Sequence, residues 1–160
     1  MALEKIISGG QSGVDRAALD AALAGGFPCG GWVPKGRQAE DGAIPDRYPV
    51  DECGLGGAKE RTRLNVRDSD ATLILTRGQG PAGLNNGTGL TVEWAVTLSK
   101  PYVVVDLDQP TDPDGVAQWL HGAGISVLNV AGPRESTSPG IYQPARDFIN
   151  AVLAVIQPRS

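Results

Sequence analysis

Two glycine-rich segments hold the residue types that bind phosphate groups in proteins. The first, residues 8–16, has the sequence Ser-Gly-Gly-Gln-Ser-Gly-Val-Asp-Arg and follows a short apolar run. Glycines let the backbone approach a bulky anion closely, and free N–H groups at the start of a helix point toward it. An arginine one turn into that helix can reach back to the same anion. We therefore expect a phosphate site formed by Gly9, Gly10, Gln11, Ser12, Gly13 and Arg16.

An alternative explains the same segment without any ligand. Ser12, followed three residues later by Asp15, has the pattern of a capping box at the start of a helix. The segment would then be a tight turn between a strand and a helix. It lacks the lysine of a Walker A loop and the spacing of a dinucleotide fingerprint. Spacing alone leaves both interpretations open.

The second segment, residues 83–93, has the sequence Gly-Leu-Asn-Asn-Gly-Thr-Gly-Leu-Thr-Val-Glu. Gly87 and Thr88 can supply backbone N–H groups and a hydroxyl to an anion, and Thr91 would complete the cleft. We expect Glu93 in the first turn of the helix that follows. There it could orient a sugar hydroxyl or transfer a proton, or it could simply offset the helix dipole.

Basic residues lie near these segments along the chain. They suit a phosphate-bearing ligand, but the window 31–67 also holds six acidic residues, so ordinary surface charge explains them equally well. Trp32, in a region rich in glycine and proline, is the aromatic side chain that we expect nearest a ligand. The basic residues are Lys35, Arg37, Arg61, Arg63, Arg67, Arg77 and Arg134.

A hydrolase triad is a weaker interpretation. Ser12, Asp106 and His121 follow the chain order of α/β-hydrolase triads. The serine, however, does not lie in a G-x-S-x-G sequence. His121 is better explained as a residue in the last turn of a helix, where positive charge is favourable.

Composition excludes several function classes. With 160 residues and a formal net charge of -4, the chain is unsuited to binding nucleic acid through bulk charge. No apolar run approaches the roughly 20 residues of a membrane helix, and we expect a cytoplasmic protein without a signal peptide. Two cysteines and one histidine match no zinc pattern, so we expect no metal site built by the protein.

Apolar strands alternate with helical segments through most of the chain. This order is typical of a doubly wound α/β sheet, and the length predicts one domain over residues 1–160. Residues 28–57 predict a long ordered loop with a short strand at 32–33. We expect further strands at 70–75, 102–105 and 125–130, and helices at 14–23, 58–66, 90–99, 113–122 and 141–156.

Residues 6–20, Ile-Ile-Ser-Gly-Gly-Gln-Ser-Gly-Val-Asp-Arg-Ala-Ala-Leu-Asp, resemble the opening of the putative molybdenum carrier family. This is also the circularly permuted YpsA-like family of the SLOG superfamily. The resemblance covers nearly the whole chain in order. It continues through residues 30–37, 39–42, 60–62, 65–70, 128–136 and 139–142.

The resemblance implies a Rossmann-like three-layer sandwich with a mainly parallel sheet. It also implies a small anionic ligand, either nucleotide-like and phosphorylated or pterin-type. Molybdate or the molybdenum cofactor would be cargo, and no cofactor would be required. We expect a homo-oligomer, a dimer or a tetramer. Lys35, Arg61 and Arg134 would add charge-assisted hydrogen bonds to the ligand.

A distant similarity to the lonely-guy phosphoribohydrolases implies an alternative function. These enzymes hydrolyse the N-glycosidic bond of nucleoside 5′-monophosphates with an arginine and a glutamate. Arg61 resembles the arginine and Glu93 resembles the glutamate, but four residues separate Thr88 from Glu93 where the enzymes have two. A scaffold protein without a small ligand is a third possibility.

Overall fold

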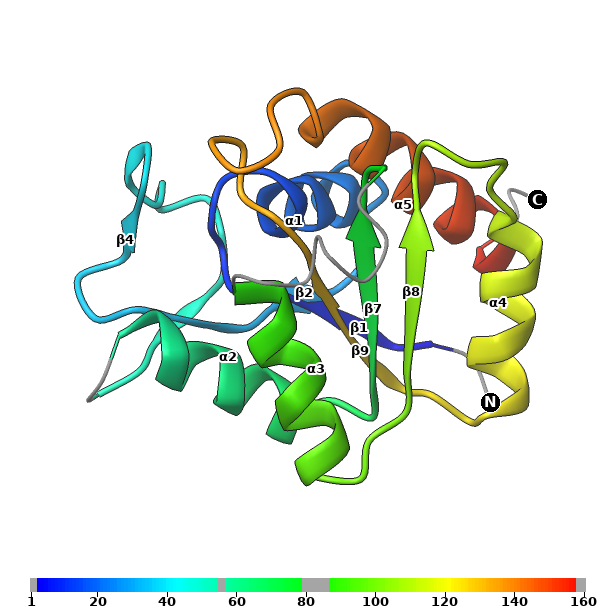
Figure 1. The fold of residues 1–160 in the computed structure, drawn as a ribbon, viewed down its shortest axis with the longest axis horizontal. Coiled ribbons are helices and arrows are strands. Elements are labelled where there is room, and N and C mark those ends of the chain that lie inside the picture. Colours follow the sequence, from blue (N-terminus) through cyan, green and yellow to red (C-terminus); the bar gives the residue numbers. More distant parts are fainter. Residues whose placement is uncertain (1–2, 55–56, 79–86, 158–160) are drawn as a thin grey trace.

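The computed structural model describes residues 3–54, 57–78 and 87–157. Within these ranges, five parallel strands form the central sheet in the order β2-β1-β9-β7-β8 (Figure 1). They are β1 (Lys5–Ile7), β2 (Cys29–Gly30), β7 (Ala71–Thr76), β8 (Tyr102–Asp106) and β9 (Val127–Ala131). Because all five strands run the same way, their carboxyl ends meet at one edge of the sheet, where ligands bind in such folds.

Helices cover both faces of this sheet. On one face α1 (Val14–Ala24) packs against α5 (Tyr142–Ile156), which also contacts α4 (Pro113–Gly122). On the other face α2 (Ala58–Arg67) packs against α3 (Gly87–Thr97) (Figure 1). The helix–sheet–helix layers confirm the predicted α/β, Rossmann-like three-layer fold.

The apolar runs form the core as their sequence predicts. Every residue of β7 is buried, because this strand has neighbours on both sides and helices on both faces. β8 alternates between exposed and half-buried residues, since it lies at the sheet edge. The longest described helix, α5, is amphipathic and buries Phe148, Ile149 and Val152. None of the described helices is long and apolar enough to cross a membrane.

Residues 28–57 hold more regular structure than the predicted loop. β2 joins the central sheet beside β1, while β3 (Trp32–Val33) pairs with β6 (Asp51–Glu52). β4 (Gln38–Ala39) and β5 (Gly42–Ala43) form a hairpin. These strands have two residues each, too short to give a periodic signal in the sequence. A small second core of Leu19, Val33, Ile44, Tyr48 and Val50 anchors the region.

The start of α3 differs from the prediction. The helix begins at Gly87 rather than Leu90, so Gly87, Thr88 and Gly89 form its first turn. Glycine is costly in the middle of a helix but tolerated at its end. As a result Glu93 lies in the second turn, not in the first as predicted. The part of the second glycine segment before residue 87 lies outside the described residues.

Candidate functional site

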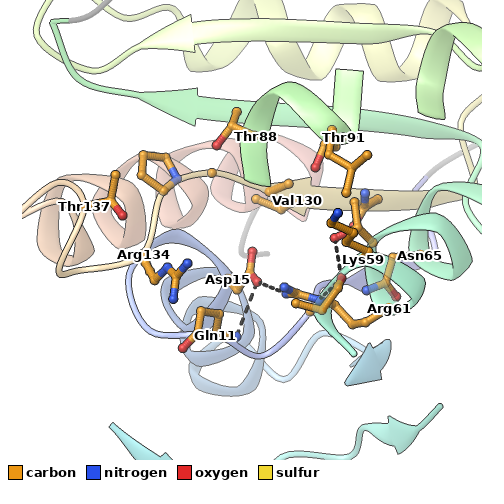
Figure 2. A pocket seen from close by; sticks show the side chains of 18 residues that line it. Gln11, Asp15, Lys59, Arg61, Asn65, Thr88, Thr91, Val130, Arg134 and Thr137 are labelled. Carbon is orange, nitrogen blue, oxygen red and sulfur yellow. Dashed lines mark hydrogen bonds and ion pairs between the residues drawn. The ribbon is translucent and has the colours of Figure 1, made fainter. Parts of the chain in front are cut away.

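A cavity of about 280 Å³ opens at the carboxyl edge of the sheet. Four parts of the chain line it: the turn after β1 with the start of α1, helix α2, the first turns of α3, and the end of β9 with the loop that follows (Figure 2). β1 and β9 are neighbours in the sheet, with Ile7 paired to Asn129. Their loops therefore open onto the same space, as expected for a ligand site in a parallel α/β sheet.

An ion pair lies at the centre of the cavity. Nη1 of Arg61, on α2, donates to Oδ2 of Asp15, on α1, at 2.9 Å. The same oxygen accepts the backbone N–H of Gln11 at 3.3 Å, and Nε of Arg61 donates to the carbonyl of Ala58 at 3.2 Å (Figure 2). The side chains of Arg61 and Asp15 are 13% and 8% exposed. This pair joins α1 to α2 across the cavity.

Burial and charge act on Asp15 in opposite directions. Burial raises the pKa of its carboxyl above the usual value, because the ionised form loses its hydration. The positive charge of Arg61 and the hydrogen bond from Gln11 lower the pKa and oppose that rise. Burial is the larger effect, so the net shift is upward.

The cavity carries more positive than negative charge. Lys59, Arg61 and Arg134 line it, and Asp15 is the one carboxylate among its described lining residues. Arg61 is matched by Asp15, whereas Lys59 and Arg134 form no ion pair with the described part of the chain. Both are exposed at the mouth of the cavity. An anion can therefore meet two cations that have no ion-pair partner among the described residues, in a chain whose net charge is -4.

Two helix N-termini face the same space. α2 begins at Ala58 and α3 at Gly87, and residues of the first turn of each helix line the cavity: Ala58 and Lys59 on α2, Thr88 and Leu90 on α3. Thr88 and Thr91 are each 4% exposed, and Figure 2 shows them on the side opposite Asp15. The unpaired N–H groups of a first helical turn and its dipole favour negative charge.

Six residues of the predicted site line the cavity, and six others are not among its described lining residues. Those in the cavity are Gly9, Gln11, Arg61, Thr88, Thr91 and Arg134. Gly10, Ser12, Gly13, Arg16, Lys35 and Glu93 are not among the described residues that line it. Gly87 is the first residue of α3.

Arg16 supports the glycine turn from outside the cavity. Its Nε and Nη2 donate to the carbonyl of Gly10 at 3.2 and 3.1 Å, and Nη1 pairs with Asp41 at 3.2 Å. Its guanidinium also lies 5.4 Å from the ring centre of Tyr48. Gly10 and Gly13 have positive φ angles of 73° and 78°, which favour glycine. These residues shape the turn that positions Gly9 and Gln11.

The capping box predicted from Ser12 and Asp15 is wrong. The N-cap of α1 is Gly13, and no side chain caps it. The hydroxyl of Ser12 instead donates to Glu40 and accepts the backbone N–H of Glu135 at 3.1 Å. The carboxylate of Asp15 forms an ion pair with Arg61. Ser12 therefore has long-range partners in place of the helix start, and Asp15 keeps one local partner, the N–H of Gln11, beside its ion pair with Arg61.

Lys35, Glu93 and Trp32 are not among the residues that line the cavity. Lys35 and Glu93 are exposed. Trp32 donates from Nε1 to Asp68 at 2.8 Å, and its backbone N–H and carbonyl bind the side-chain amide of Asn65. Trp32 thus holds α2 against the β3 segment rather than lining the cavity.

The structure adds site residues that the sequence reasoning missed: Asp15, Lys59, Asn65, Asn129 and Thr137. One of them had a usable signal. Asn129 interrupts the apolar strand Val-Leu-Asn-Val-Ala and is only 3% exposed, and a buried polar residue in such a strand is informative. Its Nδ2 donates to Oγ1 of Thr72 at 3.3 Å.

Comparisons with known proteins agree with this geometry. Among solved structures, the chain is similar to the crystal structure, at 1.45 Å resolution, of a protein named putative molybdenum carrier protein from Syntrophus aciditrophicus SB. The two share 44% sequence identity over 96% of each chain, with a TM-score of 0.88. No curated protein matches the chain. Residues 6–153 match the model of one family, and the chain therefore belongs to the circularly permutated YpsA SLOG family.

Proposed function

We propose that the cavity binds a small phosphorylated ligand, nucleotide-like or pterin-type, and that the protein carries this ligand. The observation that supports this best is the charge of the cavity. Two cations, Lys59 and Arg134, stand unpaired at its mouth among the described residues. In an acidic chain, such a concentration of positive charge in one concave site favours an anionic partner.

We expect several protein groups to share the hydrogen bonds to the phosphate. Arg134 and Lys59 would make charge-assisted hydrogen bonds to phosphate oxygens. The N-terminus of α3, with the hydroxyl of Thr88, would add backbone N–H groups and a favourable dipole. The cavity volume of about 280 Å³ suits a mononucleotide-sized molecule better than a dinucleotide.

The similar crystal structure is that of a protein named putative molybdenum carrier protein, so we propose molybdenum as part of the cargo. The cavity offers cations, hydroxyls and amides, which are suitable partners for oxyanions and phosphate esters. Molybdenum would accordingly arrive as molybdate or within the molybdenum cofactor, as cargo rather than as a resident metal. A molybdate ion resembles phosphate in shape and charge, so it could accept hydrogen bonds from the same N–H groups.

The alternative function, hydrolysis of a nucleoside 5′-monophosphate, assigns chemistry to Arg61 and Glu93. Arg61 lines the cavity, which suits either function. Glu93 is exposed in the second turn of α3 and is not among the residues that line the cavity. Ligand binding is therefore the function that the geometry supports best.

We also propose that the protein is cytoplasmic and forms a homo-oligomer. Cys29 and Cys53 are free thiols, which suits a reducing compartment. The exposed side chains of Tyr102 and Val104 on the edge strand β8 would suit contact with a second copy. Light scattering coupled to size-exclusion chromatography measures the oligomeric state directly.

Mass spectrometry of the natively purified protein, with metal analysis on the same sample, tests the proposal. We expect a phosphorylated organic molecule to be released on denaturation, with molybdenum in proportion if the cargo contains it. Lys59→Glu should lose this molecule. Lys35→Glu makes the same charge change at an exposed lysine outside the cavity and should retain it. A wild-type protein that is empty, and binds no member of a panel of nucleoside monophosphates, pterin phosphates and molybdate, would contradict the proposal.

A further inference from the structure

Two buried hydrogen-bond acceptors line the cavity without a donor. Oδ2 of Asp15 is used by Arg61 and Gln11, but Oδ1 accepts no hydrogen bond within the described part of the chain. Asn129 donates from Nδ2 to Thr72, and its Oδ1 has no partner among the described residues. Taken as whole residues, Asp15 and Asn129 are 6% and 3% exposed, so each is more than nine-tenths buried.

These two oxygens remain accessible from the cavity. Among the described residues, only one side-chain nitrogen or oxygen is both fully buried and without a hydrogen-bond partner, and it is Nε1 of Trp94. The free oxygens of Asp15 and Asn129 are therefore not sealed inside the protein, and both residues line the cavity. Buried polar groups normally have partners, and these two oxygens are open to a donor group of a molecule that enters the cavity.

The cavity is thus polarised from its interior to its mouth. The acceptors, Asp15 and Asn129, are buried, whereas the unpaired cations, Lys59 and Arg134, are exposed. Figure 2 shows Asp15 in the centre of the cavity, between Gln11 and Arg61, with Arg134 and Lys59 on opposite sides of it. A ligand that fits this arrangement places its negative charge at the mouth and its hydrogen-bond donors inside.

We infer that the cavity selects a phosphorylated molecule whose other end carries hydrogen-bond donors, and that it discriminates against bare tetrahedral oxyanions. This inference rests on the proposed function and specifies its ligand class. A sugar diol or the amino and ring N–H groups of a purine or pterin would donate to Asp15 and Asn129. A molybdate or phosphate dianion presents acceptors and negative charge, which the carboxylate of Asp15 repels.

The contact with Arg61 supports the carboxylate form of Asp15 in this role. In the ionised form both oxygens are acceptors, one for the protein and one for the ligand. Leaving such an acceptor without a donor is unfavourable, and so is bringing a second negative charge beside it. A ligand without donors should therefore bind about 10- to 100-fold more weakly than one that supplies them.

Isothermal titration calorimetry with four probes tests the inference. Guanosine 5′-monophosphate and neopterin monophosphate carry both phosphate and donors. Methyl phosphate and molybdate carry negative charge with no donor group at the far end. We expect the wild-type protein to bind at least one of the first pair about 10- to 100-fold more tightly than either of the second.

Two variants should change this preference in opposite directions. Asp15→Asn removes the repelling charge and presents an amide, so it should weaken the donor-bearing probe by about tenfold and strengthen molybdate. Asn129→Asp replaces the amide that donates to Thr72 by a carboxylate. It keeps an acceptor, adds a negative charge, and should weaken molybdate more than the donor-bearing probe. Circular dichroism of both variants verifies that they are folded. If Asp15→Asn is destabilised by the loss of its pair with Arg61, Asn129→Asp still decides the question.

The outcomes separate the inference from the proposed function. If all four probes bind the wild type with similar affinity, or if Asn129→Asp changes them all by the same factor, the inference is wrong and anion binding stands. If none of the probes binds, the proposed function fails and the inference fails with it. An unequal response in the stated directions supports both.

Discussion

The guanidinium group of Arg61 occupies the space beside Gly9 that a Cβ atom would need. Gly9 is not among the glycines with positive φ, so its backbone does not require glycine. What it provides is room for Arg61 to reach Asp15. The residue that the sequence suggests for close approach of a phosphate therefore also permits close approach of an arginine from a distant helix.

This relationship predicts the effect of Gly9→Ala. The added methyl would displace Arg61 from Asp15, and overpacking of this kind costs about 1–3 kcal/mol in the free energy of unfolding. We also expect a roughly tenfold weaker affinity for the ligand, because Arg61 would no longer be held in the cavity. Urea denaturation and calorimetric titration measure the two effects.

Gly122→Ala is the matched control for Gly9→Ala. A Cβ at Gly122, at the end of α4, meets no heavy atom within 4 Å. The change should alter the unfolding free energy by less than about 1 kcal/mol and leave ligand affinity as it was. Equal behaviour of the two variants would show that Arg61 does not depend on the space beside Gly9.

Asp15 predicts a specific pH dependence of stability. Because burial raises its folded-state pKa above the ordinary value of 3.8, the folded protein holds this proton more tightly than the unfolded chain. Its contribution to stability is therefore complete below about pH 3.8 and decreases as the pH rises through the raised pKa. As the pH increases through the raised pKa, the unfolding free energy of the wild type should decrease relative to that of Asp15→Asn.

Denaturant titrations of both proteins, at steps from pH 3.5 to 8, measure this difference. Asp147→Asn removes an exposed carboxylate whose partner is the neighbouring Gln143, and it controls for the loss of one charge. A difference between wild type and Asp15→Asn that stays constant, or grows with pH, would mean that Arg61 outweighs burial.

The layered fold followed from local patterns, whereas the site depended on long-range partners. The run Ala-Thr-Leu-Ile-Leu-Thr at residues 71–76 is a buried strand in any compact α/β chain, and α4 has the predicted bounds, 113–122. Asp15 is different, because a local capping box and a distant ion pair look the same in sequence. Only the position of α2, which brings Arg61 to Gly9 and Asp15, decides between them. Glu93 was misplaced because the helix begins three residues earlier than its apolar pattern.

Arg134→Ala and Arg16→Ala should affect binding differently although both remove an arginine near the glycine turn. Arg134 lines the cavity and forms no ion pair with the described residues, so its loss should weaken a phosphorylated ligand by about 10- to 100-fold. Arg16 instead binds the carbonyl of Gly10 and Asp41. Its loss should lower stability by about 1 kcal/mol and weaken binding much less.

Titration calorimetry with one phosphorylated probe, at two salt concentrations, compares these arginine variants. The salt dependence of affinity should decrease in Arg134→Ala, since one phosphate contact is gone. A larger loss of affinity in Arg16→Ala than in Arg134→Ala would transfer the phosphate contact to Arg16, as the sequence pattern had suggested.

Glu93→Gln separates a carrier from a hydrolase. Since Glu93 is exposed and outside the cavity lining, the variant should keep the ligand affinity of the wild type within about twofold. Incubation with nucleoside 5′-monophosphates, followed by chromatography of the free base, reveals any turnover. Turnover by the wild type that disappears in Glu93→Gln would establish the hydrolase alternative, with a movement of α3 that brings Glu93 to the ligand.

Glu40 joins the glycine turn to the loop after β9. It accepts hydrogen bonds from the hydroxyl of Ser12 and from the backbone N–H and hydroxyl of Ser136. These bonds, first that of Ser12 and then that of Ser136, lower the pKa of the Glu40 carboxyl below its usual value of 4.5. Both loops that Glu40 connects line the cavity, so this carboxylate helps to fix the shape of the site.

A lowered pKa means that this contribution to stability is present above the ordinary pKa and is lost as the pH falls through the lowered one. We expect Glu40→Gln to reduce the unfolding free energy at pH 7 by about 1 kcal/mol, a value discounted for the exposure of Glu40. Ser12→Ala should cause a similar loss, and the double variant less than the sum of the two. Additive losses in that cycle would show that Ser12 and Glu40 act independently, and a deficit that persists at pH 2.5 would assign the effect to packing rather than to the carboxylate.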